Sequence, residues 1–583
     1  MKKTAAWLAV YALEQLGVKY TFGIPGVHNT ELYDELNSST TITPVLVTHE
    51  GSASFMADAL SRVSDAGAGI GTLVIVPAAG LTHAASGIGE ALLDGIPMLI
   101  ISGGIRSDMD KRYQLHEIDQ LELAKPLTKA AFRVLRHADV VATLFEAYRI
   151  ATTGEPGPVL VELPVNLQLF PGAVGALPRW QPTPPPPFSD AEAIRRAADL
   201  LLAAQAPGLF LGWGARLALS ATTQIAELLS APVATTLQGL AAFPGDHALH
   251  SGFSFGAAAV PAARNAFAKC DCLLAVGTRF GEIATGSYGV TVPPALIHCD
   301  INPAVFDVNY PAAVRLAGDA GEVLTALAAE LRRRTESVAK PSGRPSPAAA
   351  IARDKQAYQQ EWLDHDSGER VNPGCFFGEL RRQTSANAIM VVDDGNHTYL
   401  TAELFPIHAG GRLIVPTDFN AMGYAVPAAI GAKLARPDQE VLAIVGDGAF
   451  MMTCMEIVTA ATLGLGIVYY LFHDGELSQI AQAQEIPYGR KPCSTLGQLR
   501  AEGVALATGA AYVALNSNTD IATAIGAARA LAAGGRPVIV DVAIDYSKRT
   551  AFTKGAVRTN FRRFPLAQRL RLLTRALTRR LTG

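Results

Sequence analysis

Short apolar runs that alternate with helix-like stretches dominate the hydrophobic pattern of this 583-residue chain. The clearest pair, residues 441–445 and 466–472, flanks a helical stretch near 451–463. Runs this short and this continuously apolar are typical of buried parallel strands joined by helices. The pattern therefore predicts an α/β fold built from doubly wound parallel sheets.

The alternation recurs in three segments, which we predict to be separate domains at 1–180, 190–335 and 350–548, followed by a tail at 549–583. Residues 180–188 are rich in proline and residues 337–347 are rich in Pro, Ser and Lys, as expected of linkers. A chain of this length is also too long for a single core. Further strands are predicted at 45–50, 72–76, 99–103, 158–163, 207–214, 231–235, 272–277, 295–300 and before 395.

Composition and charge narrow the class of protein. Hydrophobic residues make up 49% of the chain and charged residues 17%, which suits a large enzyme with well-buried elements. The net charge of −3 argues against a nucleic-acid partner. The six cysteines form no Cys-x-x-Cys pair, so we expect neither a zinc site nor disulfides. This cysteine pattern fits a reducing environment, and we therefore expect a cytoplasmic protein. Glu14 and Gln15 interrupt the first apolar run too early for a signal peptide, and no run is long enough for a membrane span.

Two carboxylates follow two successive predicted strands. Asp447 lies in Gly446-Asp447-Gly448-Ala449, and Asp474 follows the run 466–472. The carboxyl ends of parallel strands share one edge of a sheet, where such sheets bind ligands. Glycines let the backbone approach a phosphate, and a following helix offers it N–H groups. We therefore predict a diphosphate held through Mg²⁺ by Asp447, Asp474 and the backbone carbonyl of Glu476, with a simple tight turn as the alternative.

This arrangement resembles the cofactor motif of enzymes that bind thiamine diphosphate (ThDP, or thiamine pyrophosphate). Within that family the chain is most similar to the group containing acetolactate synthase and benzaldehyde lyase. The similarity extends from residues 22–26 to about residue 545 and excludes the tail. Two positions depart from the family. Asp474 stands where most members have Asn, which adds a negative charge, and Val165 stands where acetolactate synthases carry Lys.

The resemblance implies pyrimidine-binding (Pyr), central Rossmann-like and diphosphate-binding (PP) domains, and it assigns roles to their residues. Glu50, which ends the strand predicted at 45–50, would face N1′ of the ThDP aminopyrimidine and exchange a proton with it. Met422 would support the bent form of the cofactor, in which the reacting groups lie close together. Further cofactor contacts are implied at Gly395, Asn396, His397 and Asn420.

Three other residues are candidates for handling the substrate. His28 is similar in position to a histidine of benzaldehyde lyase and could move protons at neutral pH. Alignment on Asp119 and Lys129 would place His116 at the reacting centre as a second proton carrier. Gln479 would line the substrate channel. The alternatives are a histidine that makes a local hydrogen bond near a helix start for His28 and an exposed loop residue for His116.

In acetolactate synthase the middle domain binds FAD, and Arg279 in Gly277–Glu282 would meet a flavin phosphate. The family's usual Gly-Met-His-Gly is missing from 252–258, however, and benzaldehyde lyase binds no flavin, so a structural domain is the alternative. In this family ThDP bridges the first domain of one subunit and the third domain of its partner. A homodimer is therefore the expected minimum, and a homotetramer is expected.

The tail is basic. Residues 554–583 contain nine Lys or Arg and no Asp or Glu, and the leucines lie on one face of a predicted helix: Leu566, Leu570, Leu573, Leu577 and Leu581. Such a helix could lie on the inner face of an anionic membrane, dock on the protein itself or close over the active site.

The activity implied is that of a ThDP- and Mg²⁺-dependent carboligase of acetolactate synthase type. It would decarboxylate a 2-oxoacid such as pyruvate and add the acyl unit to a second carbonyl compound. One alternative is a lyase that cleaves 2-hydroxyketones, favoured by His28 and by the missing Lys at Val165. Another is a non-catalytic, membrane-associated relative that binds ThDP.

Overall fold

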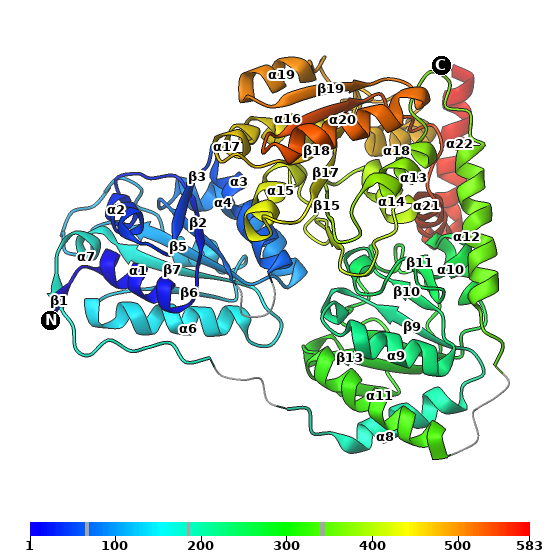
Figure 1. Ribbon diagram of the computed structural model, residues 1–583, viewed down its shortest axis with the longest axis horizontal. Helices are drawn as coiled ribbons and strands as arrows, with labels where there is room; N and C mark the ends of the chain where they lie inside the picture. The colour runs from blue at the N-terminus through cyan, green and yellow to red at the C-terminus, as the bar shows by residue number, and fades with distance from the viewer. Residues whose placement is uncertain (65–68, 183–186, 338–343, 583) are drawn as a thin grey trace.

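The computed structural model describes residues 1–64, 69–182, 187–337 and 344–582, with parts of both predicted linkers (183–186 and 338–343) outside them. In this part of the chain, three six-stranded sheets are parallel throughout and are flanked by helices (Figure 1). The predicted α/β class with three doubly wound sheets is confirmed. The exact domain boundaries stay predictions.

The first sheet has the strand order β3-β2-β4-β5-β7-β6. Its strands are β2 (Tyr20–Gly23), β3 (Thr43–Leu46), β4 (Gly71–Ile75), β5 (Met98–Gly104), β6 (Ala130–Arg133) and β7 (Pro158–Pro164). The helices are α1 (Ala5–Gln15), α2 (Thr30–Ser38), α3 (Glu50–Val63), α4 (Ala79–Asp94), α5 (Gln120–Ala124), α6 (Val140–Thr152) and α7 (Val165–Leu169). Two short strands, β1 (Lys2–Lys3) and β8 (Gly172–Ala173), pair antiparallel beside this sheet.

The middle sheet has the order β11-β10-β9-β12-β13-β14. It consists of β9 (Pro207–Leu211), β10 (Val233–Thr235), β11 (His250–Phe253), β12 (Cys272–Val276), β13 (Ala295–Asp300) and β14 (Val314–Ala317), with α8 (Ala191–Ala203), α9 (Leu219–Leu229), α10 (Pro261–Ala266) and α11 (Ala320–Ser337). Its central strands are completely buried, as their continuously apolar sequences require.

The third sheet has the order β16-β15-β17-β18-β20-β19. Its strands are β15 (Ile389–Val392), β16 (Arg412–Ile414), β17 (Val441–Gly446), β18 (Val468–Phe472), β19 (Ala511–Leu515) and β20 (Val538–Val542). The helices are α12 (Ala348–Leu363), α13 (Pro373–Gln383), α14 (Asn396–Leu404), α15 (Ala425–Ala435), α16 (Asp447–Thr453), α17 (Ile457–Thr462), α18 (Ser478–Tyr488), α19 (Ala501–Thr508) and α20 (Ile521–Ala533).

Two elements near the predicted site differ from expectation. The strand predicted at 45–50 ends at Leu46, and Glu50 instead begins α3, because the His49 side chain caps that helix by accepting the N–H of Gly51. The helix predicted near 451–463 is interrupted by a 3₁₀ turn, Cys454–Glu456. Thr453 leaves the helical conformation there, and its hydroxyl donates to the carbonyl of Gly423 instead.

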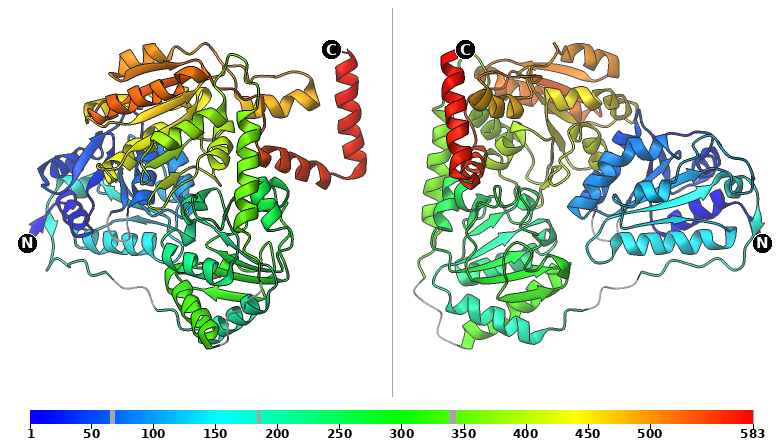
Figure 2. Two further views of the ribbon diagram at one scale, coloured as in Figure 1. Left: turned by 45° about the vertical axis from the view of Figure 1, so that its right-hand side comes forward. Right: turned by 180° about the vertical axis from the view of Figure 1, so that it is seen from behind.

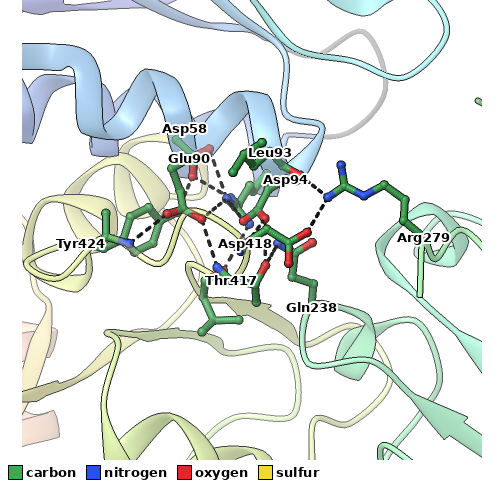
Figure 3. Close-up of polar contacts among 12 residues, drawn as sticks. Asp58, Glu90, Leu93, Asp94, Gln238, Arg279, Thr417, Asp418 and Tyr424 are labelled. Carbon is green, nitrogen blue, oxygen red and sulfur yellow. Dashed lines mark hydrogen bonds and ion pairs between the residues drawn. The ribbon is translucent and has the colours of Figure 1, made fainter. Parts of the chain in front are cut away.

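A buried polar network fixes the first sheet's helices against the third sheet (Figure 3). Arg62 donates to Asp58 at 2.6 Å and to Asp94 at 2.7 Å, and all three side chains are buried. Burial and the neighbouring Asp94 raise the pKa of Glu90 well above its usual range. Glu90 accepts backbone N–H groups of the segment 417–421, so α4 is held directly beside the residues that lead to Met422.

The tail forms two helices, α21 (Ala551–Arg563) and α22 (Leu566–Thr582), and α22 lies at the edge of the molecule (Figure 2). Arg575 lies over the ring of Tyr488, so α22 packs against α18. Leu566 and Leu570 are exposed, and the side chains of Leu573, Leu577 and Leu581 lie outside what the structure describes. Of the helices described, none combines the length and the apolar character needed to cross a membrane.

Helix α21 begins on a buried carboxylate. Glu403 accepts the hydroxyl of Tyr358 at 2.5 Å and the N–H groups of Ala551 and Phe552 at 3.1 and 2.8 Å. The Phe552 ring stacks on Tyr399, with ring centres 4.4 Å apart. The start of the tail is therefore part of the fold, anchored on α14.

Glu403 should make the stability of the protein pH-dependent. Burial raises its pKa from 4.5 to about 7. As the pH rises from about 4.5 to 7 the unfolded chain loses this proton first, so the free energy of unfolding falls. Glu403→Gln cannot ionise, and its stability relative to the native protein should increase between pH 5 and 7.5 by up to roughly 3 kcal/mol. Urea unfolding at the two pH values measures this difference. A stability difference between the two proteins that does not change with pH would contradict the assignment.

Candidate functional site

A cavity opens at the carboxyl ends of β17 and β18, where the sequence predicts a diphosphate. It is lined by residues of the third sheet and its connections. The predicted cofactor and substrate residues that line it are Gly395, Asn396, His397, Met422, Gly446, Asp447, Gly448, Ala449, Asp474, Glu476 and Gln479. Asn420 does not line the cavity, but its side chain bonds to Asp394, which does.

Asp447 organises the floor of this cavity. It is buried at the start of α16, and its Oδ1 accepts the N–H of Gly448 at 2.8 Å. Its Oδ2 accepts the N–H groups of Asp474 and Gly475 at 3.2 and 2.7 Å, which ties the loop after β18 to the loop after β17. Burial raises the pKa of Asp447, and these N–H bonds oppose the rise. Burial also raises the pKa of Asp474 to about 6, although the Ser478 hydroxyl donates to its carboxylate.

The donor set suits a cation that is shared with phosphate oxygens. In the described part of the chain, no cluster of three His, Cys, Asp or Glu side chains is arranged to hold a metal ion. Asp447 and Asp474 provide two carboxylates, and Glu476 lines the same cavity. Mg²⁺ typically takes one or two protein carboxylates and completes its shell with phosphate and water. The residues present therefore fit a magnesium diphosphate.

Unpaired polar atoms in the cavity wall support the same ligand. Among the described residues, Asn396 Nδ2, His397 Nε2, Gln479 Oε1 and the Tyr546 hydroxyl are buried and have no hydrogen-bond partner. Burial lowers the pKa of His397 to about 3, so its ring is neutral. Leaving buried polar groups unpaired costs free energy, and a bound polar ligand would satisfy them.

Two glycines are required by the way His397 fits into the cavity. A Cβ at Gly395 would lie 2.6 Å from His397 Cε1, and a Cβ at Gly446 would lie 2.9 Å from the same atom. Both distances are too short for a side chain, so the glycines allow the imidazole to lie between the two loops.

Tyr546 was missed in the sequence. Its position just beyond β20, at the same sheet edge, was the available signal.

Glu50 is the first residue of α3, beside the first sheet, and does not line this cavity of the same chain. Its side chain is 8% exposed, and its Oε2 is 3.0 Å from Nδ1 of His83. Sequence reasoning missed His83, because it lies on a helix of small residues whose facing the sequence does not reveal.

The two predicted proton carriers His28 and His116 are in contact. Their Nδ1 atoms are 3.2 Å apart, and their ring centres are 5.1 Å apart. Burial lowers the pKa of His28, and the charge of His116 lowers it further. His116 has a left-handed backbone, with φ of 66°. One of the two facing nitrogens must donate and the other accept, so the pair holds a single proton between its rings.

A second cavity lies between the middle sheet and the other two and contains Arg279. Arg279 bonds to Asp418 at 2.7 Å and to the carbonyl of Leu93 (Figure 3). It also bonds to Glu155 at 3.2 Å, so its charge is already paired. The carboxylates among the described lining residues are Asp94, Glu155, Asp300, Asp319 and Asp418. Burial raises the pKa of Asp300 to about 6.

Comparison with known proteins gives consistent matches along the chain. Models for the thiamine pyrophosphate enzyme N-terminal TPP binding domain, central domain and C-terminal TPP binding domain match residues 3–123, 194–327 and 393–542. The acetolactate synthase large subunit of Corynebacterium glutamicum is 33% identical over 93% of this chain and 86% of its own. The acetolactate synthase isozyme 3 large subunit of Escherichia coli is 28% identical over 94% of this chain and 95% of its own. A probable acetolactate synthase large subunit of Methanocaldococcus jannaschii is 30% identical over 83% of this chain and 82% of its own.

Proposed function

This chain belongs to the thiamine pyrophosphate enzymes, and from that premise we propose that it is a ThDP- and Mg²⁺-dependent carboligase of acetolactate synthase type. It would decarboxylate a 2-oxoacid such as pyruvate and add the acyl unit to a second carbonyl compound. The observation that carries the proposal is the cavity in which Asp447 and Asp474 lie beside several buried, unpaired polar atoms.

Each group has a defined task in this proposal. When bound, ThDP supplies the nucleophilic carbon that attacks the substrate carbonyl. Asp447 and Asp474 hold the metal, and Asn396 and His397 donate to the diphosphate from the start of α14. Met422 lines the same cavity and would pack against the bound cofactor. Glu50 holds the proton that is exchanged with the cofactor ring.

We place Glu50 and Asp447 in one catalytic centre through a homodimer. Glu50 does not line the cavity that contains Asp447 in the same chain, which supports a second subunit as its source. Two such centres would follow from one twofold axis.

The tail contact between α22 and α18 supports docking of the tail on the enzyme itself rather than on a membrane. The pairing of Arg279 supports the structural role of the middle domain over a flavin site.

The deciding experiment follows purified protein with ThDP, Mg²⁺ and pyruvate, with and without an added aldehyde. Release of CO₂ together with a new hydroxyketone supports the carboligase. Cleavage of an added hydroxyketone without release of CO₂ from pyruvate would replace it with the lyase. Val165 in place of Lys, and the contact of His28 with His116, favour that second candidate.

The histidine pair should act as a unit. His28→Asn and His116→Asn should each lower kcat by roughly 10²-fold, because the proton held between the two rings can no longer be transferred. The double variant should be little worse than either single one, since residues that share one hydrogen bond are not additive. Steady-state kinetics of the four proteins give the coupling. Independent, multiplicative losses would show that the two imidazoles work separately.

A further inference from the structure

His83 on α4 touches the carboxyl group that is expected to work on the cofactor ring. Its Nδ1 lies 3.0 Å from Glu50 Oε2. The two side chains differ in their access to solvent, because that of Glu50 is 8% exposed and that of His83 is 48% exposed. The ring of His49 stacks on His83, with ring centres 4.6 Å apart. A nearly buried acid is thus connected to solvent through one imidazole.

Close packing of α3 and α4 produces this contact. Gly87 lies so near Ser54 that a Cβ would come within 2.2 Å of the serine hydroxyl. His83 lies four residues before Gly87 on α4, and Glu50 lies four residues before Ser54 on α3. Each is therefore one turn earlier, on the face of its helix that meets the other helix. The glycine therefore sets the helix spacing at which imidazole and carboxylate meet.

The two oxygens of Glu50 have different surroundings. Oε2 faces His83, whereas Oε1 makes no hydrogen bond with any of the described residues. Oε1 is therefore the oxygen that is free to bond to a ligand. His83 can bond to Glu50 in either protonation state, donating to the carboxylate or accepting from the acid.

The other ionisable groups near Glu50 are poorly placed to exchange protons with it. Tyr33 donates its hydroxyl to the carbonyl of Val74, and burial raises its pKa, with Glu50 adding to the rise. Nδ1 of His49 accepts the N–H of Gly51 and so carries no proton. Glu456 accepts from Thr48 instead. In the described part of the chain, His83 is the ionisable side chain that contacts the Glu50 carboxyl group.

We propose that His83 is a positioning and proton-relay residue that restores the proton of Glu50 from solvent after each transfer to the cofactor ring. When Glu50 gives up its proton at Oε1, His83 passes its Nδ1 proton to Oε2 and takes one from water at Nε2. One proton enters from solvent and one reaches Glu50, so the step balances. The inference rests on the proposed function, because it needs a ligand whose ring nitrogen meets Glu50.

The test compares His83→Asn, His83→Ala and the neighbouring control His49→Asn with the native protein. Binding of ThDP with Mg²⁺ is measured by calorimetry, and exchange of the ThDP C2 proton for deuterium is measured by NMR over a range of pH, with and without added imidazole. Asparagine can hold the Glu50 carboxylate but cannot pass a proton through its side chain. His83→Asn should therefore keep the ThDP affinity within about threefold and slow exchange by about 10-fold or more.

Added imidazole should restore much of the exchange in His83→Ala, and His49→Asn should exchange at nearly the native rate. Exchange at the native rate in His83→Asn would overturn the relay. So would a loss of affinity in both His83 variants that imidazole does not repair, because that result describes packing alone. The proposed function itself fails, and the relay with it, if the native protein binds no ThDP or if Glu50→Gln exchanges as fast as the native protein.

Discussion

Glu50→Gln should lower the rate of carbon–carbon ligation or cleavage by about 10²–10⁴-fold, the range typical of a lost general acid–base group. Glutamine has nearly the same shape and can still accept a hydrogen bond from His83, so the fold and the ThDP affinity should change little. The expected loss lies in kcat, because the amide cannot exchange a proton with the cofactor ring. Steady-state kinetics, together with calorimetric ThDP binding, separate these two effects.

The matched control is Glu162→Gln. Glu162 is a buried carboxylate within strand β7 of the first sheet, and it pairs with Arg133 at 2.9 Å. Its loss should lower the thermal unfolding midpoint while the turnover of folded enzyme is kept. Near-native turnover in Glu50→Gln would remove Glu50 from the chemistry and leave His83 without a partner to serve.

Asp447→Asn should weaken binding of ThDP with Mg²⁺ by about 100-fold or more, since even the outer contacts of metal ligands are worth about 10–100-fold in affinity. The asparagine oxygen can still accept one of the N–H groups that Asp447 now holds, so the two loops should keep most of their arrangement. The substitution removes one of the two carboxylates that are proposed to bind Mg²⁺ in this cavity. Calorimetric titration at several Mg²⁺ concentrations measures the effect.

Asp541→Asn is the control for this second variant. Asp541 lies on the neighbouring strand β20 and bonds to His473 and Tyr512, but it does not line the cavity. The Asp541→Asn substitution should leave the Mg²⁺ dependence of ThDP binding unchanged. If Asp447→Asn binds ThDP with native affinity and the same Mg²⁺ dependence, the metal site lies elsewhere.

The two variants together test whether subunits share a centre. When Glu50→Gln and Asp447→Asn chains are unfolded and reassembled together, each mixed dimer should carry one doubly substituted centre and one intact centre. Roughly a quarter of the native activity should then return, because about half of the dimers are mixed and each has one working site. Failure to recover any activity from mixtures that do form dimers would place both residues in one chain's own site.

Much of the fold could be predicted because parallel strands buried on both faces must be continuously apolar. Residues 441–445 and 466–472 show this pattern, and both are strands whose carboxyl ends meet. The meeting of Asp447 and Asp474 in one cavity follows from that topology, and so does the gathering of Gly395, Asn396 and His397 on the same edge. Local signals were sufficient here because these residues directly follow strands.

Side chains on helices of small residues were not predictable in the same way. In α3 and α4, polar and apolar positions follow no clear stripe, so the sequence does not reveal which residue faces which neighbour. The contact of His83 with Glu50, the pairing of Arg279 with Asp418 and the break after Thr453 all depend on partners far away in the chain. The sequence by itself determined the sheets, the carboxylates at their edge and the resemblance to ThDP enzymes. Only the tertiary structure decided that the Glu50 carboxyl group contacts His83, because the approach of Gly87 to Ser54 sets the distance between the two helices that carry these side chains.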